Sequence, residues 1–244
     1  MGDVFLDAGY ETGLFGKWHL GDNYSFLPEQ RGFKETFYHK GGGVGQTPDY
    51  WNNNYQDDIY FRNGEPEESK GYCTDVFFEE AISFINKNKE NPFLCFLSLN
   101  APHSPFNVPK EYYELYENES DLLESQKRFY GMITNIDDNF GKLHQNVKSL
   151  GILDNTIIIF TTDNGTSNGY KYSKKDKKWL GFNAGMRGTK TSEYDGGHRV
   201  PFIIKWKKGG LFGGHNYSGL SAHVDMLPTL LSFAKIAFCL LYTS

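Results

Sequence analysis

The sequence predicts an α/β protein in which a mostly parallel sheet is sandwiched between helices. Two continuously apolar runs, at 92–100 and within 156–165, each end abruptly at polar residues, and a further apolar run follows at 200–206. Uninterrupted runs of this length are typical of strands that are buried on both faces of a parallel sheet. Other stretches space their apolar residues at the helical period, as helices that pack on a sheet do.

Size, charge and cysteine content limit the class of protein. With 244 residues the chain is long enough to bury a substantial core, and its net charge of -5 gives no reason to expect a nucleic-acid surface. No apolar run is long enough to cross a bilayer, so we expect no membrane span. Cys73, Cys95 and Cys239 form no CxxC pair, which indicates neither a disulfide framework nor a zinc site.

The individual elements follow from hydrophobic period and from turn residues. The predicted helices are 1–9, 72–89, 121–150 with Gly151 as its stop, and one that opens near Asp225. The predicted strands begin at Thr12 and lie at 92–100, within 156–165 and at 200–206. We expect the glycine-rich stretch 22–71 to be an irregular excursion and the lysine-rich stretch 171–178 to be a solvated loop.

The run TIIIFTTDNG places Asp163 and Asn164 at the end of a predicted strand, where ligands collect in parallel sheets. A carboxylate beside an amide carbonyl suits a hard cation such as Ca²⁺, with Mg²⁺ as the less favoured choice. Asp-Asn-Gly is also an ordinary turn sequence, so the residues alone leave both interpretations open. Two other acidic pairs, Asp57-Asp58 and Asp137-Asp138, are interpreted as surface or capping groups rather than as metal pairs.

Basic residues follow other predicted strands. Lys17 and His19 share one face of an extended segment, which favours an anion site, although a surface lysine beside a packed histidine is an equally simple interpretation. His103 lies between two prolines that stiffen its loop, whether for function or only as a rigid turn. Small residues around Lys190 leave room for a bulky anion to approach the backbone.

These strand ends are expected to meet along one edge of the sheet. Two lysines, two histidines and a possible divalent-cation corner describe a pocket for a tetrahedral, multiply charged oxyanion. Sulfate esters and phosphate esters are the candidates, because cations at such a site stabilise the charge that grows in the transition state.

Five segments resemble successive motifs of the type I sulfatases, the arylsulfatase branch of the alkaline-phosphatase superfamily. They are GYETGLFGKWHLG, NAPHSPF, IIIFTTDNG, the GTKTSEYDGGHRVPFI block and HVDMLPTL, and they occur in family order across nearly the whole chain. The resemblance implies an alkaline-phosphatase-like (sulfatase) fold that is truncated here. It also implies a sulfuric ester hydrolase that cleaves sulfate monoesters with a formylglycine nucleophile and Ca²⁺ assistance.

The resemblance also implies roles for individual residues. Lys17 would bind sulfate oxygens, and His19 would take a proton from the hydrated formylglycine when sulfate is expelled. His103 and Lys190 would contact the sulfate and assist the leaving alcohol, while Asp163 and Asn164 would be two Ca²⁺ ligands. His198 and Arg199 are expected to help to bind the substrate, although a packing role for them is equally consistent with the sequence.

The sequence also departs from the family pattern. None of the three cysteines lies in the C/S-x-P-x-R motif that supplies formylglycine, and the family's Asp-Asp metal pair at its opening strand is missing. We therefore expect residues 1–237 to be part of a sulfatase catalytic domain whose nucleophile lies upstream. We expect the last residues, 238–244, to be a non-native tail.

The sequence leaves two other functions open. A phosphate or phosphonate ester hydrolase of the same superfamily would share the fold and the cation corner, and a non-catalytic carbohydrate- or Ca²⁺-binding module would need no nucleophile. The expected partners are a sulfated small molecule or glycan and, for the whole protein, the formylglycine-generating enzyme. The family resemblance implies an exported protein, whether periplasmic, secreted or lysosomal.

Overall fold

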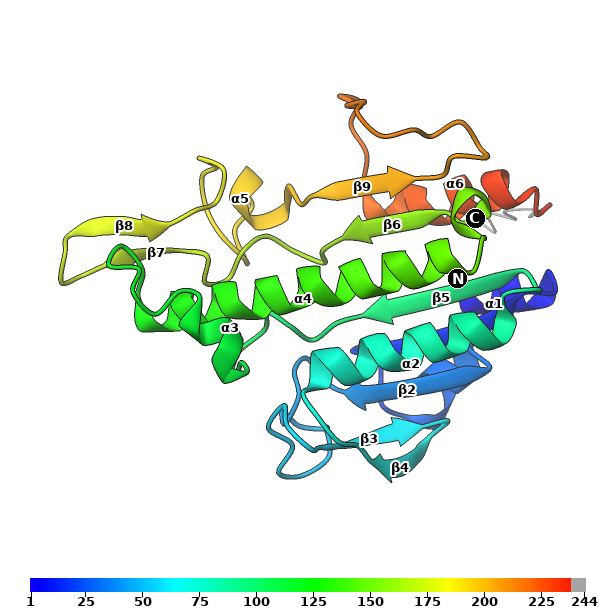
Figure 1. Ribbon diagram of the computed structural model, residues 1–244, viewed down its shortest axis with the longest axis horizontal. Helices are drawn as coiled ribbons and strands as arrows, with labels where there is room; N and C mark the ends of the chain where they lie inside the picture. Colours follow the sequence, from blue (N-terminus) through cyan, green and yellow to red (C-terminus); the bar gives the residue numbers. More distant parts are fainter. Residues whose placement is uncertain (238–244) are drawn as a thin grey trace, which may run out of the picture.

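The computed structural model describes residues 1–237, and its centre is a five-stranded sheet with the strand order β4-β3-β2-β1-β5 (Figure 1). Strand β1 pairs in parallel with β2 on one side and with β5 on the other, so the carboxyl ends of these three strands lie at one edge. Strands β3 and β4 extend the sheet in antiparallel fashion beyond β2. The five strands are β1 (Glu11–Trp18), β2 (Glu35–Lys40), β3 (Ile59–Arg62), β4 (Glu65–Glu68) and β5 (Phe93–Ser98).

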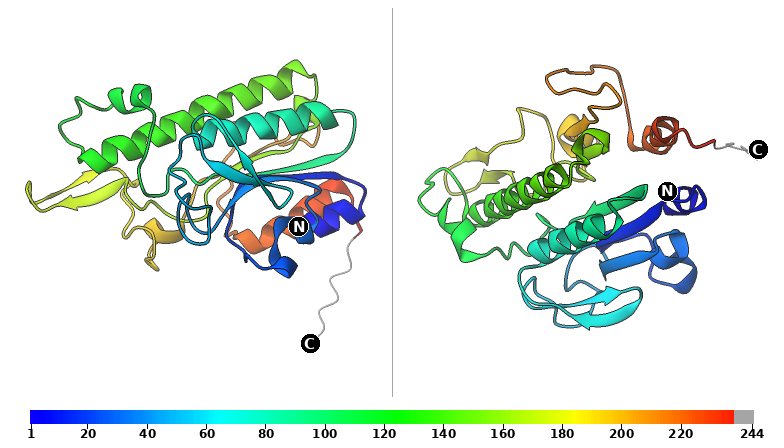
Figure 2. Two further views of the ribbon diagram at one scale, coloured as in Figure 1. Left: turned by 90° about the horizontal axis from the view of Figure 1, so that it is seen from below. Right: turned by 45° about the vertical axis from the view of Figure 1, so that its right-hand side comes forward.

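Helices cover both faces of this sheet. Helices α2 and α4 lie on one side, and α1 and α6 lie on the other, as Figure 2 shows. Short 3-10 turns occur at Tyr24–Phe26, Pro28–Arg31, Leu153–Asn155 and His223–Asp225. The α-helices are α1 (Gly2–Asp7), α2 (Cys73–Asn88), α3 (Lys110–Glu114), α4 (Glu124–Ser149), α5 (Asp195–His198) and α6 (Met226–Ala234). The predicted α/β sandwich is confirmed, and within residues 1–237 no helix is both long and apolar enough to cross a membrane.

Alternation along β1 divides the core into two layers. Phe15 belongs to the larger cluster, which α2 and α4 cover, whereas Leu14 and Trp18 belong to a smaller cluster on the opposite face. The Trp18 indole N–H donates to the carbonyl oxygens of Gly21 and Phe26, which ties the segment after β1 to that face. Lys17 and Trp18 follow each other in β1, so their side chains point to opposite faces of the sheet.

The two long helices occur where the hydrophobic period places them. A buried hydrogen-bond network joins them, since the side-chain amides of Asn135 and Asn139 on α4 both donate to the Asp75 carboxylate on α2, at 2.8 and 2.6 Å. Within α4, Met132 is fully buried, whereas the next residue, Ile133, is exposed. Asp137 and Asp138 are exposed on the outer side of α4, as expected.

The stretch 22–71 is more regular than predicted. It contains β2, β3 and β4, and β2 is an inner strand of the sheet. Asp58 in this stretch is buried, and its carboxylate accepts hydrogen bonds from the backbone N–H groups of Asn54 and Tyr55 and from the hydroxyl of Tyr60. The prediction that the Asp57-Asp58 pair caps a turn is confirmed, because these donors belong to the turn itself.

The lysine-rich stretch 171–178 is not a loop. It lies in an antiparallel hairpin of β7 (Tyr170–Ser173) and β8 (Lys178–Gly181). Aromatic and polar residues alternate on either side of the lysine-rich turn, and this alternation favours two strands.

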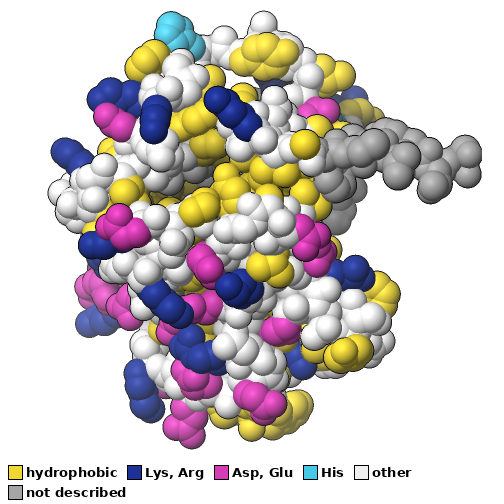
Figure 3. Space-filling view, turned by 90° about the vertical axis from the view of Figure 1, so that its right-hand side faces the viewer, with side chains coloured by type: hydrophobic (Ala, Val, Ile, Leu, Met, Phe, Trp, Pro, Cys, Tyr) yellow, Lys and Arg dark blue, Asp and Glu magenta, His cyan; other side chains and the backbone are white. Residues whose placement is uncertain are grey.

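The strand of the TIIIFTTDNG run also differs from its prediction. Strand β6 (Ile158–Thr161) pairs antiparallel with β9 (Phe202–Lys205) in a separate two-stranded sheet, and its residues are only partly buried. A strand with one neighbour keeps an open edge, and β5 likewise pairs with β1 alone within the described residues. On the face shown in Figure 3, hydrophobic side chains gather in a hollow across the middle of the molecule. Both continuously apolar runs thus form strands with less cover than their composition predicts.

An imidazole is fully buried in β2. His39 lies opposite Lys17 in the parallel register and packs near Phe77 of α2, with ring centroids 6.0 Å apart. Its Nδ1–H donates to the Lys40 carbonyl, and its buried Nε2 has no hydrogen-bond partner within the described residues. Burial, with a smaller contribution from the positive charges of Lys17, His103 and His19, lowers the pKa of His39 to about 3.

This pKa predicts a specific loss of stability in acid. The pKa of His39 in the folded chain lies below its unfolded value of about 6.5, so the unfolded chain takes up the proton first as pH falls. The contribution of neutral His39 to stability is therefore complete above about pH 6.5 and is lost as the pH falls towards about 3. Between about pH 7.5 and about pH 4.5 the free energy of unfolding is expected to fall by about 2.5 kcal/mol more in the wild type than in His39→Phe. Urea titrations at each pH measure the difference. His215→Phe, at an exposed position, is the matched control, and parallel curves for wild type and His39→Phe would contradict the prediction.

Candidate functional site

Two residues that lie far apart in the sequence meet at the carboxyl ends of β1 and β6. The Lys17 ammonium lies 3.6 Å from a carboxylate oxygen of Asp163, and the two side chains are 17% and 69% exposed. Lys17 is the last residue but one of β1, and Asp163 follows the end of β6 by two residues. The ordinary geometry of strand ends therefore brings a cation and a potential metal ligand to one place, although the strands belong to different sheets.

The glycine run after β2 forms a wall beside two predicted histidines. A Cβ atom built on Gly42 would lie 3.0 Å from His19 Cε1, and one built on Gly43 would lie 3.0 Å from His103 Nδ1. Both imidazoles therefore approach the backbone more closely than most side chains would permit. Glycine at positions 42 and 43 therefore leaves room for the two imidazole rings.

His103 is held in one orientation and one tautomer. Its backbone N–H donates to the Asn100 carbonyl at 2.9 Å, and the Tyr55 hydroxyl donates to the His103 carbonyl at 3.0 Å. The ring Nδ1 lies 2.7 Å from the Ser104 carbonyl oxygen, which can only accept, so Nδ1 carries the hydrogen. In the neutral ring, Nε2 then keeps its lone pair, which is the atom that can exchange a proton with a ligand.

The loop after β6 is locked by contacts through its backbone. Gly165 N–H donates to the Gly197 carbonyl at 2.8 Å, and the backbone passes so close to Gly196 that no side chain fits at position 165. The Lys190 backbone N–H donates to the Thr166 carbonyl at 2.9 Å. Through this bond the half-buried Lys190 lies next to the loop that carries Asp163 and Asn164.

The donor set at this loop fits half of a hard-cation site. Asp163 presents an exposed carboxylate, and Asn164 uses its side-chain N–H to donate to the Gly165 carbonyl, which leaves its oxygen free within the described residues. Oxygen ligands of this kind suit Ca²⁺. No group of three or more His, Cys, Asp or Glu side chains gathers to hold a metal within residues 1–237.

Within the described residues, neither His198 nor Arg199 makes a hydrogen bond or ion pair with Lys17, Asp163 or Lys190. Both are exposed on or beside α5, where His198 Nε2–H donates to the Glu193 carbonyl at 3.0 Å and Arg199 lies 3.5 Å from the Asp195 carboxylate. The backbone of Gly196 and Gly197, rather than these two side chains, contacts the loop after β6.

Sequence reasoning missed two histidines. His39 lies opposite Lys17 in the strand register, and His19 and His103 lie close enough to affect its pKa. His223 Nε2–H donates to the carbonyl of Thr162, the residue before Asp163, at 3.3 Å. His223 opens the HVDMLPTL segment, which was a signal for it, whereas His39 gave no signal because β2 was not predicted as a strand.

Neither cysteine within the described residues is a reactive thiol. Cys73 and Cys95 are free, and burial raises the pKa of both, to about 12 for Cys95. A thiol with such a pKa is almost entirely protonated at neutral pH and is a poor nucleophile. Cys239 lies outside the described residues, as does the predicted non-native tail 238–244.

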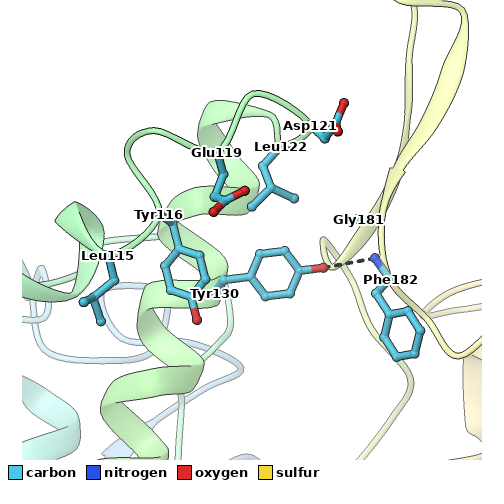
Figure 4. Close-up of a pocket in the computed structure, with 8 residues that line it drawn as sticks. All are labelled: Leu115, Tyr116, Glu119, Asp121, Leu122, Tyr130, Gly181 and Phe182. Carbon is cyan, nitrogen blue, oxygen red and sulfur yellow. Dashed lines mark hydrogen bonds between the residues drawn. The ribbon is translucent and has the colours of Figure 1, made fainter.

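One surface hollow lies away from these strand ends. It has a volume of about 450 Å³ and lies between α4 and the base of the β7–β8 hairpin (Figure 4). Tyr116 and Tyr130 line it together with the carboxylates of Glu119 and Asp121. An acidic hollow does not suit an anionic ester, so we assign the candidate site to the basic groups at the strand ends instead.

Comparison with known proteins places this geometry in a family. A sulfatase family model matches residues 1–236. The chain is 29% identical to the uncharacterized sulfatase YdeN of Escherichia coli K12, over 96% of this chain and 43% of that protein. It is 28% identical to human N-acetylgalactosamine-6-sulfatase, over 96% of this chain and 44% of that protein.

Solved structures agree with the sequence comparison. The crystal structure of Ps i-CgsB in complex with k-i-k-neocarrahexaose superposes with a TM-score of 0.82 at 28% identity, and covers 98% of this chain and 53% of that one. The chain therefore spans about half the length of several relatives that it matches. Its match to the family model over almost all of its residues shows that the chain belongs to the sulfatase family.

Proposed function

We propose that the protein to which this chain belongs hydrolyses sulfate monoesters, with a sulfated glycan or small molecule as its substrate. The observation that carries the proposal is the meeting of Lys17 with Asp163, beside two histidines that rest on one glycine wall. The names of the relatives support this substrate class, since they include a sugar-specific sulfatase and a structure bound to a carrageenan-type oligosaccharide.

The basic side chains have distinct tasks in this proposal. Lys17 and Lys190 bind the non-bridging sulfate oxygens, and they do so more strongly as negative charge grows in the transition state. The protonated His103 ring donates its Nε2 proton to the departing alcohol oxygen as the S–O bond breaks, while its Nδ1–H remains bonded to Ser104. His19 exchanges a proton on the side of the incoming nucleophile.

Two groups outside the described residues complete this chemistry. A formylglycine at another position of the polypeptide would supply the nucleophile, and a separate formylglycine-generating enzyme would make it. Asp163 and Asn164 would hold Ca²⁺, which would supply positive charge to polarise the ester. The same family pattern supports export of the whole protein, to the periplasm, the lysosome or the outside of the cell.

Phosphate and phosphonate monoesters are the rival substrates, since a phosphate group has the same tetrahedral shape. A binding module without catalysis is the other alternative. Competition between sulfate and phosphate esters distinguishes a sulfatase from a phosphate or phosphonate hydrolase. Turnover by a protein that carries the nucleophile distinguishes a sulfatase from a binding module.

The first prediction concerns ligand binding to the chain itself. Lys17→Ala is expected to weaken binding of 4-nitrophenyl sulfate by about 10- to 100-fold, because a charge-assisted hydrogen bond is lost. Calorimetry measures the change, and Lys110→Ala, at an exposed lysine of α3, is the control. Equal binding by wild type and Lys17→Ala, or tighter binding of 4-nitrophenyl phosphate than of the sulfate, would remove the basis of the proposal.

The second prediction concerns proton transfer in the whole protein. His103→Ala is expected to lower kcat by about 10² to 10⁴ for an alkyl sulfate, and much less for 4-nitrophenyl sulfate, whose leaving group needs little protonation. Steady-state kinetics with the two esters measure the ratio. A similar loss for both would assign His103 to binding rather than to the leaving group.

The third prediction concerns the metal. The described residues offer two protein ligands, so we expect weak Ca²⁺ binding by this chain, with a Kd above about 1 µM, and its loss in Asp163→Ala. Titration calorimetry checks both, with Asp137→Ala as the control at an exposed carboxylate of α4. Binding that Asp163→Ala leaves unchanged would place the ion elsewhere.

A further inference from the structure

We propose that the β7–β8 hairpin is a platform for a polymeric sulfated glycan, which binds there while one of its sulfate groups occupies the Lys17–Asp163 site. This inference rests on the proposed function and narrows its substrate to a polysaccharide. It concerns a surface of the molecule that the sulfate site does not use.

One face of the hairpin is an exposed aromatic surface. Tyr172 and Trp179 are cross-strand partners, and they are 49% and 55% exposed. Tyr170 stacks on Trp179 with ring centroids 4.8 Å apart and an interplanar angle of 14°. Adjacent rings of this kind form a broad apolar surface with polar edges, on which the C–H face of a pyranose ring can stack.

The hairpin also carries a concentrated positive charge. Five exposed lysines lie on it: Lys171, Lys174, Lys175, Lys177 and Lys178. The one acid among them, Asp176, accepts a hydrogen bond from Ser173 Oγ and so shapes the turn. Lys178 has an acidic partner in Asp121, and within the described part of the chain the other four have no ion pair. The whole chain has a net charge of -5, so this basic region is a local feature.

Aromatic faces flanked by lysines match a sugar chain with periodic negative groups. Rings contact the apolar sugar faces, and the lysines contact the sulfates between them. A neutral apolar partner would gain nothing from the lysines, and a simple anion would gain nothing from the rings.

The base of the hairpin is fixed to α4. The Tyr130 hydroxyl donates to the Gly169 carbonyl at 2.7 Å and accepts from the Phe182 N–H at 3.0 Å (Figure 4). On the opposite face of the hairpin, Leu180 is buried, and its carbonyl accepts from the Gln126 side chain at 2.9 Å. These bonds hold the aromatic face outward before any ligand arrives, which lowers the ordering cost of binding.

The hairpin also lies at the end of the molecule that carries the candidate site. It projects beyond the carboxyl ends of β5 and β6, at the same end as α5 (Figure 1). The segment 182–189 leads directly from β8 to Lys190, whose backbone bonds to the loop after β6. A glycan with one sulfate at the strand ends therefore has its neighbouring residues free to reach the hairpin.

The test uses the 244-residue chain and three polymers of matched length: dextran sulfate, unmodified dextran and the single-stranded DNA poly(dT). We expect tight, salt-sensitive binding of dextran sulfate and little binding of the other two. Trp179→Ala is expected to weaken dextran sulfate binding about tenfold or more, and Trp179→Phe to retain most of it. Trp51→Ala, at a tryptophan that is 90% exposed in the loop before β3, is the matched control.

The lysines are tested in the same assay. Replacement of Lys174, Lys175 and Lys177 together by serine is expected to weaken binding and to reduce its salt dependence, and the same change at the exposed lysines 70, 110 and 148 is not. Circular dichroism confirms that each variant is folded. Three outcomes would overturn the proposal: wild-type binding by Trp179→Ala, equal losses in the two lysine triples, or tighter binding of poly(dT) than of dextran sulfate.

Failure of this inference is distinguishable from failure of the proposed function. Lys17→Ala is expected to weaken the binding of both 4-nitrophenyl sulfate and dextran sulfate, whereas Trp179→Ala is expected to weaken only that of dextran sulfate. In the whole protein, Trp179→Ala is expected to lower kcat/KM for a sulfated polysaccharide and to leave that for 4-nitrophenyl sulfate unchanged. Loss of both rates would show that the hairpin supports the fold rather than the glycan.

Discussion

The crowding of positive groups around one buried imidazole is the constraint on which the site depends. Lys17, His19 and His103 all lie close enough to His39 to disfavour its protonation, and burial adds the largest share of that effect. Like charges repel, so such a group of side chains persists only if a rigid scaffold holds it or a negative partner relieves it. Asp163 relieves part of the repulsion at Lys17, and an anionic ligand would relieve the rest. In the proposed function, an oxyanion that enters the site would therefore be stabilised there.

Backbone contacts supply the rigidity that this arrangement needs. The glycine wall beside the histidines and the close approach of Gly165 to Gly196 both bring main chain against main chain or ring without a side chain between them. Hydrogen bonds from Tyr55 and to Asn100 fix the His103 loop from below. Such contacts have no rotamers to reorganise, so they hold charged groups at fixed positions more firmly than a cluster of long side chains would.

The sequence predicts the parts of the fold that depend on local period and leaves out those that depend on neighbours. The helix α4 and the strands β1 and β5 follow from their apolar spacing, and the match of TIIIFTTDNG to a strand end is sound. Strand β2 was missed because ETFYHK is short and lies between polar, glycine-rich stretches, so its burial comes from the strands on either side. The hairpin was missed because its many lysines made the segment resemble a polar loop, although aromatic residues alternate with other residues along its strands.

For the candidate site, too, features set by the local sequence were predictable and features set by neighbouring elements were not. The meeting of Lys17 with Asp163 was predictable only in part, because both residues lie at strand ends as expected, but β1 and β6 belong to different sheets rather than to the one parallel sheet that the sequence predicts. The outward position of His198 and Arg199 was not, since it depends on α5 placing its two glycines, rather than its charged side chains, against the loop after β6.

The distribution of charge connects the site with the hairpin. A chain with a net negative charge repels polyanions over most of its surface, and the fields of its basic residues act over roughly 10 Å at moderate salt. The basic groups of the strand ends and those of the hairpin lie at the same end of the molecule (Figure 1). In the proposed glycan binding, the basic groups at that end would attract an approaching polyanion. In the proposed reaction, a desulfated sugar would keep its contact with the rings but lose the charge that the lysines bind, which would favour its departure.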